Sequence, residues 1–174
     1  MPELRLLLSS GQCPIPYGPE NRPDMQNFGY KSLLDNPKAI EDIPELVGEP
    51  EMLKLVAQIN VKGHKFETVR IVHSVQENGG LFQRLMVLGI IFQDRKLFSS
   101  YDSCLIFAGT FLDRITQSSF DWTVYPMLEI GRARLVREDF DGWIMDVYLA
   151  SVGKSEAAAK KNLNLLLQSL NIFD

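Results

Sequence analysis

Only two histidines are available for acid–base or metal chemistry in this sequence, His64 and His73. They are too far apart to share one turn of a helix, and no carboxylate or cysteine stands at a spacing that would complete a site. We therefore expect structural or exposed roles for both. Gly153-Lys154-Ser155 matches the end of a phosphate-binding loop, but Tyr148 replaces the upstream glycine. The sequence thus predicts no enzyme, no cofactor and no metal.

Arg132, Arg134 and Arg137 form the densest basic group, and the first two lie in a segment predicted to be a strand. Residues two apart in a strand point to the same face. Two adjacent guanidinium groups could bind an anionic lipid head group, a nucleic acid or an acidic partner. The alternative is a solvated sheet face on which they pair with Glu138, Asp139 or Asp141.

Pro14-Ile15-Pro16-Tyr17 is the most motif-like segment of the chain. Its prolines favour an extended, polyproline-like conformation, and with an exposed tyrosine it could bind an aromatic-lined groove on a partner. Pro14, Pro16 and Tyr17 are therefore candidate partner-binding residues, together with Arg132 and Arg134. The alternative is an unstructured lead-in to the folded domain.

Proline divides the chain into two parts, because eight of the nine prolines lie at or before Pro50. Proline removes a backbone donor and fixes φ, which excludes long helices there. We predict a Pro-rich, largely irregular and flexible segment over 1–48, with 9–30 mobile, and a globular domain over 49–174. Cys13 and Cys104 make no disulfide framework, which favours a reducing compartment.

The charge is also uneven along the chain. Residues 1–60 carry 5 Lys/Arg and 9 Asp/Glu, whereas 61–174 carry 13 of each. A net charge of −4 argues against non-specific nucleic-acid binding, which needs a basic surface. With no run of eighteen apolar residues and an apolar stretch at 6–8 too short for a signal peptide, we expect a cytoplasmic protein that is neither secreted nor membrane-spanning.

Hydrophobic periodicity predicts the elements of the second part. Pro50 begins a helix whose buried face includes Leu53, Val56 and Ala57. A β-rich stretch over 61–75 ends at a turn signal at 78–80. Residues 81–92 fit either a helix or a buried strand, and a helix is slightly favoured.

The remaining segments complete an α+β fold. We predict a strand over 104–112 with Gly109 as a bulge and a hairpin of strands over 123–136 and 143–152. An amphipathic helix over 155–171, capped by Ser155, should bury one apolar face that includes Leu163, Leu166, Leu167 and Leu170. Together these give a mostly antiparallel sheet of four or five strands packed with helices.

In outline the chain resembles the matrix proteins of rhabdoviruses. The resemblance rests on Pro14-Ile-Pro-Tyr17, on Gly63-His-Lys-Phe66 before a strand, and on Gly131-Arg132-Ala-Arg134 with Gly142-Trp143. It departs from the family where Ile15 splits the prolines of the budding motif and where the N-terminal segment is acidic instead of Lys-rich. The resemblance implies a self-associating structural protein that bridges the ribonucleoprotein and the envelope.

The sequence therefore predicts a non-enzymatic interaction protein, with a viral matrix protein as its specific form. Its expected partners are itself, a viral ribonucleoprotein and an anionic membrane surface, in the virion and the host cytoplasm, with no small-molecule substrate. The alternative is a small cytosolic bacterial adaptor, chaperone or immunity protein that binds one protein. An enzyme with an unrecognised site is the third class, because a fold does not fix a function.

Overall fold

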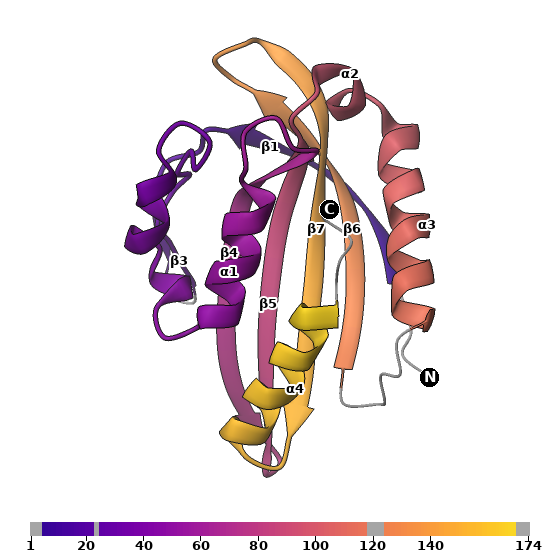
Figure 1. The fold of residues 1–174 in the computed structure, drawn as a ribbon. Helices are drawn as coiled ribbons and strands as arrows, with labels where there is room; N and C mark the ends of the chain where they lie inside the picture. Colours follow the sequence, from indigo (N-terminus) through magenta and orange to yellow (C-terminus); the bar gives the residue numbers. More distant parts are fainter. Residues whose placement is uncertain (1–4, 23–24, 118–123, 170–174) are drawn as a thin grey trace.

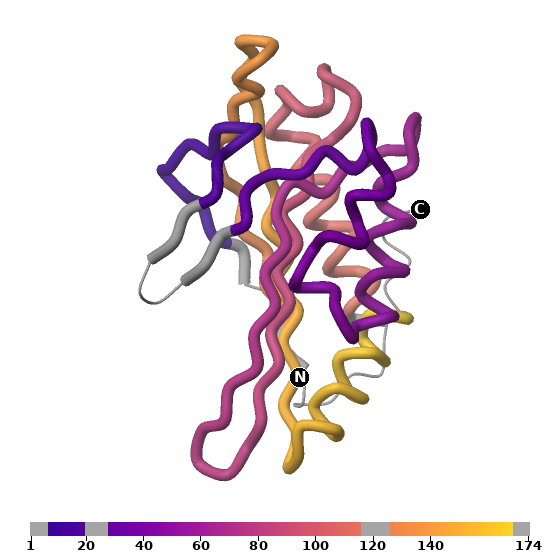
Figure 2. Tube along the Cα trace, turned by 90° about the vertical axis from the view of Figure 1, so that its left-hand side faces the viewer, coloured from indigo at the N-terminus to yellow at the C-terminus, as the bar shows by residue number. Residues whose placement is uncertain are grey.

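The computed structural model describes residues 5–22, 25–117 and 124–169. It has the predicted α+β architecture, in which helices pack on one face of a five-stranded sheet (Figures 1 and 2). The strand order is β1-β6-β7-β5-β4, and only the β1–β6 pair is parallel. The strands are β1 (Arg5–Ile15), β4 (Phe66–Asn78), β5 (Leu81–Phe92), β6 (Val124–Leu135) and β7 (Phe140–Gly153).

Two hairpins form the centre of the sheet. The β4–β5 turn contains Gly79 and Gly80, both at positive φ, as a tight hairpin turn requires. The β6–β7 pair confirms the predicted hairpin, and its turn includes Asp139 at a φ of 53°. The sequence predicted the β6–β7 hairpin and the Gly79-Gly80 turn, but not the strand that follows this turn.

Two predicted elements are wrong in type. Residues 81–92, for which a helix was slightly favoured, form β5, which is buried along its second half because it lies between two strands and is covered on both faces. The strand predicted over 104–112 is part of α3 (Tyr101–Gln117), so Gly109 is no bulge. Cys104, Phe107 and Phe111 are buried at helical spacing and contact the core.

The N-terminal segment is more ordered than predicted. Within 1–48, β1 joins the main sheet, and shorter elements follow: β2 (Glu20–Arg22), β3 (Met25–Asn27), η1 (Pro37–Asp42) and η2 (Pro44–Leu46). Ile15, Leu33 and Leu46 are buried in the common core. Pro14 is accommodated because β1 is an edge strand. The prediction of a largely irregular segment outside the domain is therefore wrong for the described residues. The flexibility of this segment stays a prediction.

Three longer helices cover the sheet face. α1 (Pro50–Ile59) begins at the predicted proline, but it buries Met52, Leu55, Val56 and Ile59, whereas Leu53 and Ala57 are exposed. α2 (Arg95–Phe98) is a single turn before α3. Among the described residues, no helix is long and apolar enough to cross a bilayer.

α4 (Glu156–Ser169) confirms the predicted C-terminal helix. The Ser155 hydroxyl accepts a hydrogen bond from the Ala158 amide at 3.2 Å, which is the predicted N-cap. Leu163, Leu166 and Leu167 are buried as expected. Leu170, the fourth residue of the predicted face, lies outside the described residues.

Candidate functional site

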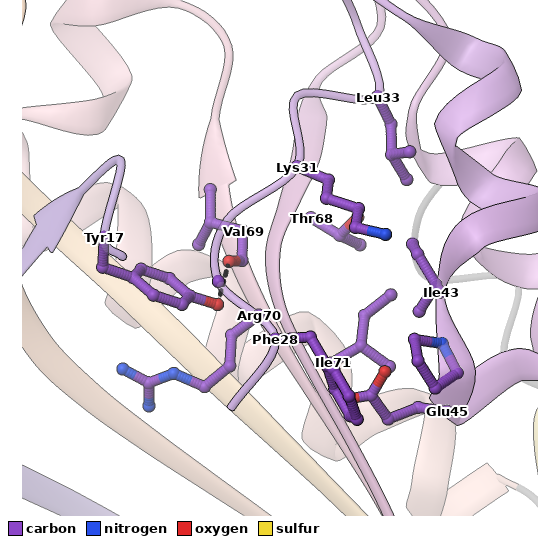
Figure 3. Close-up of a pocket in the computed structure, with 12 residues that line it drawn as sticks. Tyr17, Phe28, Lys31, Leu33, Ile43, Glu45, Thr68, Val69, Arg70 and Ile71 are labelled. Atoms are coloured by element: carbon purple, nitrogen blue, oxygen red, sulfur yellow. Dashed lines mark hydrogen bonds between the residues drawn. The ribbon is translucent and has the colours of Figure 1, made fainter. Parts of the chain in front are cut away.

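The Pro14–Tyr17 segment packs against its own domain. The Tyr17 hydroxyl donates a hydrogen bond to the Val69 carbonyl of β4 at 2.8 Å (Figure 3), and burial raises the Tyr17 pKa to about 12. Pro14 lies in β1, where it pairs with Arg134, whereas Pro16 and Tyr17 follow the strand and lead to β4. A partner could therefore bind the tyrosine as a peptide ligand only after this hydrogen bond is broken.

The hollow beside Tyr17 is small. Figure 3 shows Tyr17 and Arg70 on one side of it, and Leu33 and Ile43 on the other. Its volume of about 40 Å³ is far below that of a ligand pocket, which typically measures about 300–1,000 Å³. This hollow is therefore a packing defect where the N-terminal segment meets β4.

The two predicted arginines lie on β6, but they are not a free basic pair. Arg134 forms ion pairs with Asp139 and with Asp141, the latter at 2.7 Å. The Arg132 guanidinium lies 4.9 Å from the centre of the Trp143 ring and is exposed. Arg134 therefore pairs with the acidic turn, as the alternative interpretation expected. Of these two arginines, only Arg132 forms no ion pair with a described residue.

The histidines lie apart and face different surroundings. His64 is exposed in the loop before β4. The Nε2 atom of His73 lies 3.1 Å from an Arg84 guanidinium nitrogen, and burial followed by the Arg84 charge lowers the His73 pKa. Arg84 also contacts Glu49 at 2.5 Å and Glu156 at 3.2 Å, so this cluster joins α1 and α4 to the sheet. No three His, Cys, Asp or Glu side chains within the described ranges could hold a metal ion.

A polar cluster that sequence reasoning missed lies on β4, β7 and β1. Arg70 donates a hydrogen bond to Asp146 at 2.8 Å and lies 3.4 Å from the Cys13 sulfur. Burial raises the Asp146 pKa to about 6, although the Arg70 charge opposes the shift. Arg70, Asp146 and Cys13 come from distant parts of the chain, so no local pattern identifies the cluster. The arginine and the carboxylate neutralise each other, which favours a structural ion pair.

Three exposed apolar side chains lie on the outer face of α3. Leu105, Ile106 and Leu112 are exposed there, and Ile106 is 70% exposed. Gly109 lies between them, and a Cβ at that position would meet no atom within 4 Å. We call these four residues the α3 outer row. α3 is therefore apolar on two faces, one in the core and one in solvent.

The outer row has the chemistry of a helix-docking surface. Leu105, Gly109 and Leu112 follow the i, i+4, i+7 spacing that aligns residues along one side of a helix. An exposed glycine inside a helix costs about 1 kcal/mol relative to alanine, so this one has no local benefit. A glycine does allow a second backbone to approach closely. The sequence signal was the unbroken apolar run from Cys104 to Ala108, because a helix buried on one face only would carry polar residues within it. The prediction of a strand over 104–112 hid this signal.

The chain was also compared with known proteins. It matches no family model, no curated protein and no solved structure. Its function is therefore inferred from the surfaces and clusters of the described residues.

Proposed function

We propose that this chain is a non-enzymatic interaction protein that associates with copies of itself through the α3 outer row. The observation that carries the proposal is the exposure of Ile106, at 70%, beside an exposed glycine in the middle of a long helix. Monomeric proteins expose single apolar residues freely, but a contiguous apolar surface marks an interaction site. The outer row brings three exposed apolar side chains together on one helix, beside the exposed Asp102 and Asp113.

The expected gain from docking is considerable. Fully burying an exposed Leu or Ile side chain contributes about 1.5–3 kcal/mol, and Ile106 brings the largest share because Leu105 and Leu112 are only 39% and 41% exposed. Gly109 would let two α3 helices cross closely, so the leucines on either side of it could pack against the opposite helix. The neutral charge of residues 61–174, with 13 cations and 13 anions, does not oppose the approach of two copies.

A second copy fits this surface because a two-fold contact requires one self-complementary patch. In such a contact Gly109 lies at the symmetry axis and faces Gly109 of the other copy. This geometry predicts that position 109 of one copy lies close to position 109 of the other.

As its specific form, we propose a viral matrix protein that assembles between a ribonucleoprotein and an envelope. The sequence resemblance and a self-associating surface support this form, and Arg132 is the residue we expect to contact an anionic lipid or the ribonucleoprotein. That contact should weaken as salt rises, because Arg132 is exposed. A cytoplasmic location belongs to the same proposal.

The second candidate is an adaptor that binds one protein partner. It is favoured by β1, an edge strand on which Leu7 and Leu8 are exposed. An exposed strand edge can accept an additional strand from another chain. An adaptor would form a stable heterodimer and would have no need of contacts between copies.

Site-specific cross-linking tests the proposed geometry. In a Cys13→Ser background, Gly109→Cys should form an intermolecular disulfide, because Cα atoms joined by a disulfide lie about 4.4–6.8 Å apart. Lys161→Cys, exposed on α4, is the control and should form little. Equal cross-linking at both positions, or none at either, would contradict a contact centred on Gly109.

A further inference from the structure

A larger hollow lies at the end of the sheet, away from the α3 outer row. Its volume is about 300 Å³, and it is lined by the end of β1, the 30–35 segment, the start of β4 and the β6–β7 turn. This volume is at the lower end of the range of small-molecule sites. Unlike the hollow beside Tyr17, it could hold a metabolite-sized ligand.

Glu67 on β4 lines this hollow and is 7% exposed. No hydrogen bond to its carboxylate is made by any described residue. Burial raises the Glu67 pKa, and the main opposing influence is the charge of Arg95. That guanidinium, however, is bound to both carboxylate oxygens of Glu138, at 2.6 and 2.7 Å. Among the described residues, the Glu67 oxygens are not fully buried atoms without a partner, so a ligand in the hollow could replace the water that solvates them.

The same hollow carries cations without counter-ions. Lys62 and Arg137 both line it and are exposed, and neither forms an ion pair within the described ranges. Asp35 and Glu138 line the hollow as well, so it presents charges of both signs, and a ligand with charge of one sign alone would meet like charges. A ligand that carries both charges satisfies both groups.

The rest of the lining is suited to a short apolar group. Ile15 and Leu135 are buried beside the hollow, and the Tyr30 ring is half-buried there. Apolar walls with a few convergent polar groups are typical of small-molecule sites. The aliphatic walls contribute burial of apolar area, while the charges fix the orientation of the ligand.

We propose that this hollow binds a zwitterionic amino acid with an aliphatic side chain. The ligand ammonium donates to the Glu67 carboxylate, and its carboxylate accepts from Arg137, with Lys62 as a second cation. The side chain lies against Ile15 and Leu135. This departs from the sequence-based expectation of no small-molecule ligand, because residues 15, 67, 135 and 137 come together only in the folded sheet.

Calorimetric titration of the full chain with L-leucine at neutral pH tests the proposal. We expect saturable one-to-one binding. 4-Methylpentanoate, which lacks the ammonium, and 3-methylbutylamine, which lacks the carboxylate, should each bind about tenfold more weakly or worse, since a hydrogen bond to a charged group contributes about 1.5–3 kcal/mol. Absence of L-leucine binding, or equal binding of either analogue, would overturn the assignment.

Variants test the two charged contacts separately. Glu67→Gln and Arg137→Gln should each weaken L-leucine binding about tenfold or more. The controls are Glu77→Gln, exposed on the same strand, and Arg132→Gln, exposed on β6 and outside the hollow; both should bind as wild type does. Circular dichroism checks that each variant is folded, and Arg137→Gln decides the question if Glu67→Gln does not fold. Wild-type affinity in a folded Glu67→Gln or Arg137→Gln variant would overturn the site.

Discussion

Asp146 occupies the space that a side chain at position 89 would need. A Cβ on Gly89 would lie 2.6 Å from the Asp146 Oδ1 atom and 2.7 Å from the Arg70 Cβ. Such contacts are far inside van der Waals distance, so glycine at this position is required by the ion pair above it. The Arg70–Asp146 pair and Gly89 therefore form one packing unit across β4, β5 and β7.

This relationship predicts the effect of adding one methyl group. Gly89→Ala should destabilise the protein by about 1–3 kcal/mol, the usual cost of overpacking a well-packed interior. Gly109→Ala is the matched control, because a Cβ there meets nothing, and it should stabilise the monomer by up to about 1 kcal/mol. Urea unfolding at low protein concentration measures both. A Gly89→Ala variant as stable as wild type would contradict the predicted clash.

The buried Asp146 carboxyl predicts a specific pH dependence. Its pKa is raised from 3.8 to about 6, so the folded state holds this proton more tightly than the unfolded state does. This difference in pKa stabilises the folded state by up to about 3 kcal/mol. The stabilisation is fully present below about pH 4 and is lost as the pH rises through about 6.

Chemical unfolding from pH 4 to 7 checks this sign. The stability of wild type relative to Asp146→Asn should fall as the pH rises, because the variant lacks the titrating group. Ser74→Ala changes no charge and should follow wild type. A wild type that gains stability relative to Asp146→Asn with rising pH would show that the carboxyl pKa is lowered instead.

Two neighbouring leucines of α4 provide a matched test of the core. Leu166 is 0% exposed and Leu165 is 52% exposed. Leu166→Ala should destabilise the protein by about 2–5 kcal/mol through lost burial and a residual cavity. Leu165→Ala should change stability by about 0.5 kcal/mol or less. Equal effects in thermal or urea unfolding would mean that α4 does not pack on the sheet through this face.

The Arg84 cluster should show the difference between buried and exposed ion-pair partners. Replacing Arg84 by methionine leaves the buried Glu49 with Lys160, at 3.1 Å, as its remaining cation, so the cost should lie above about 1 kcal/mol but below the about 3–5 kcal/mol of an uncompensated buried charge. Glu156→Gln removes a partner whose side chain is 61% exposed, so it should cost less than about 1 kcal/mol. Urea unfolding measures both variants. A milder effect of Arg84→Met than of Glu156→Gln would contradict the buried geometry.

Local signals predicted part of the fold. Pro50, the short connection before β7 and the Ser155 cap each act within a few residues, so α1, the β6–β7 hairpin and α4 were predicted, as was the turn at Gly79-Gly80. The sequence did not predict whether 81–92 and 104–112 form strands or helices, because short apolar runs fit a central strand and a helix equally well. Their tertiary neighbours decided the outcome.

The N-terminal strand and the polar sites depend on contacts between distant residues. β1 is a strand because it pairs in parallel with β6, and nothing near β1 in sequence encodes that partner. Likewise, the environment of Glu67 comes from Arg95, Glu138 and Arg137, which only the folded sheet brings close. The arginines at 132 and 134 were found from sequence, but the neutralisation of Arg134 was decided by the turn geometry at 139–141.

Self-association through α3 is tested most directly by sedimentation velocity across a wide range of protein concentration. Wild type should shift from monomer to larger species as concentration rises. Ile106→Lys should remain monomeric with unchanged unfolding, because Ile106 contributes to the interface and little to the core. Val47→Lys, at an exposed apolar residue away from α3, should associate as wild type does. A wild type that stays monomeric at every concentration, or an Ile106→Lys variant that associates like wild type, would contradict the account.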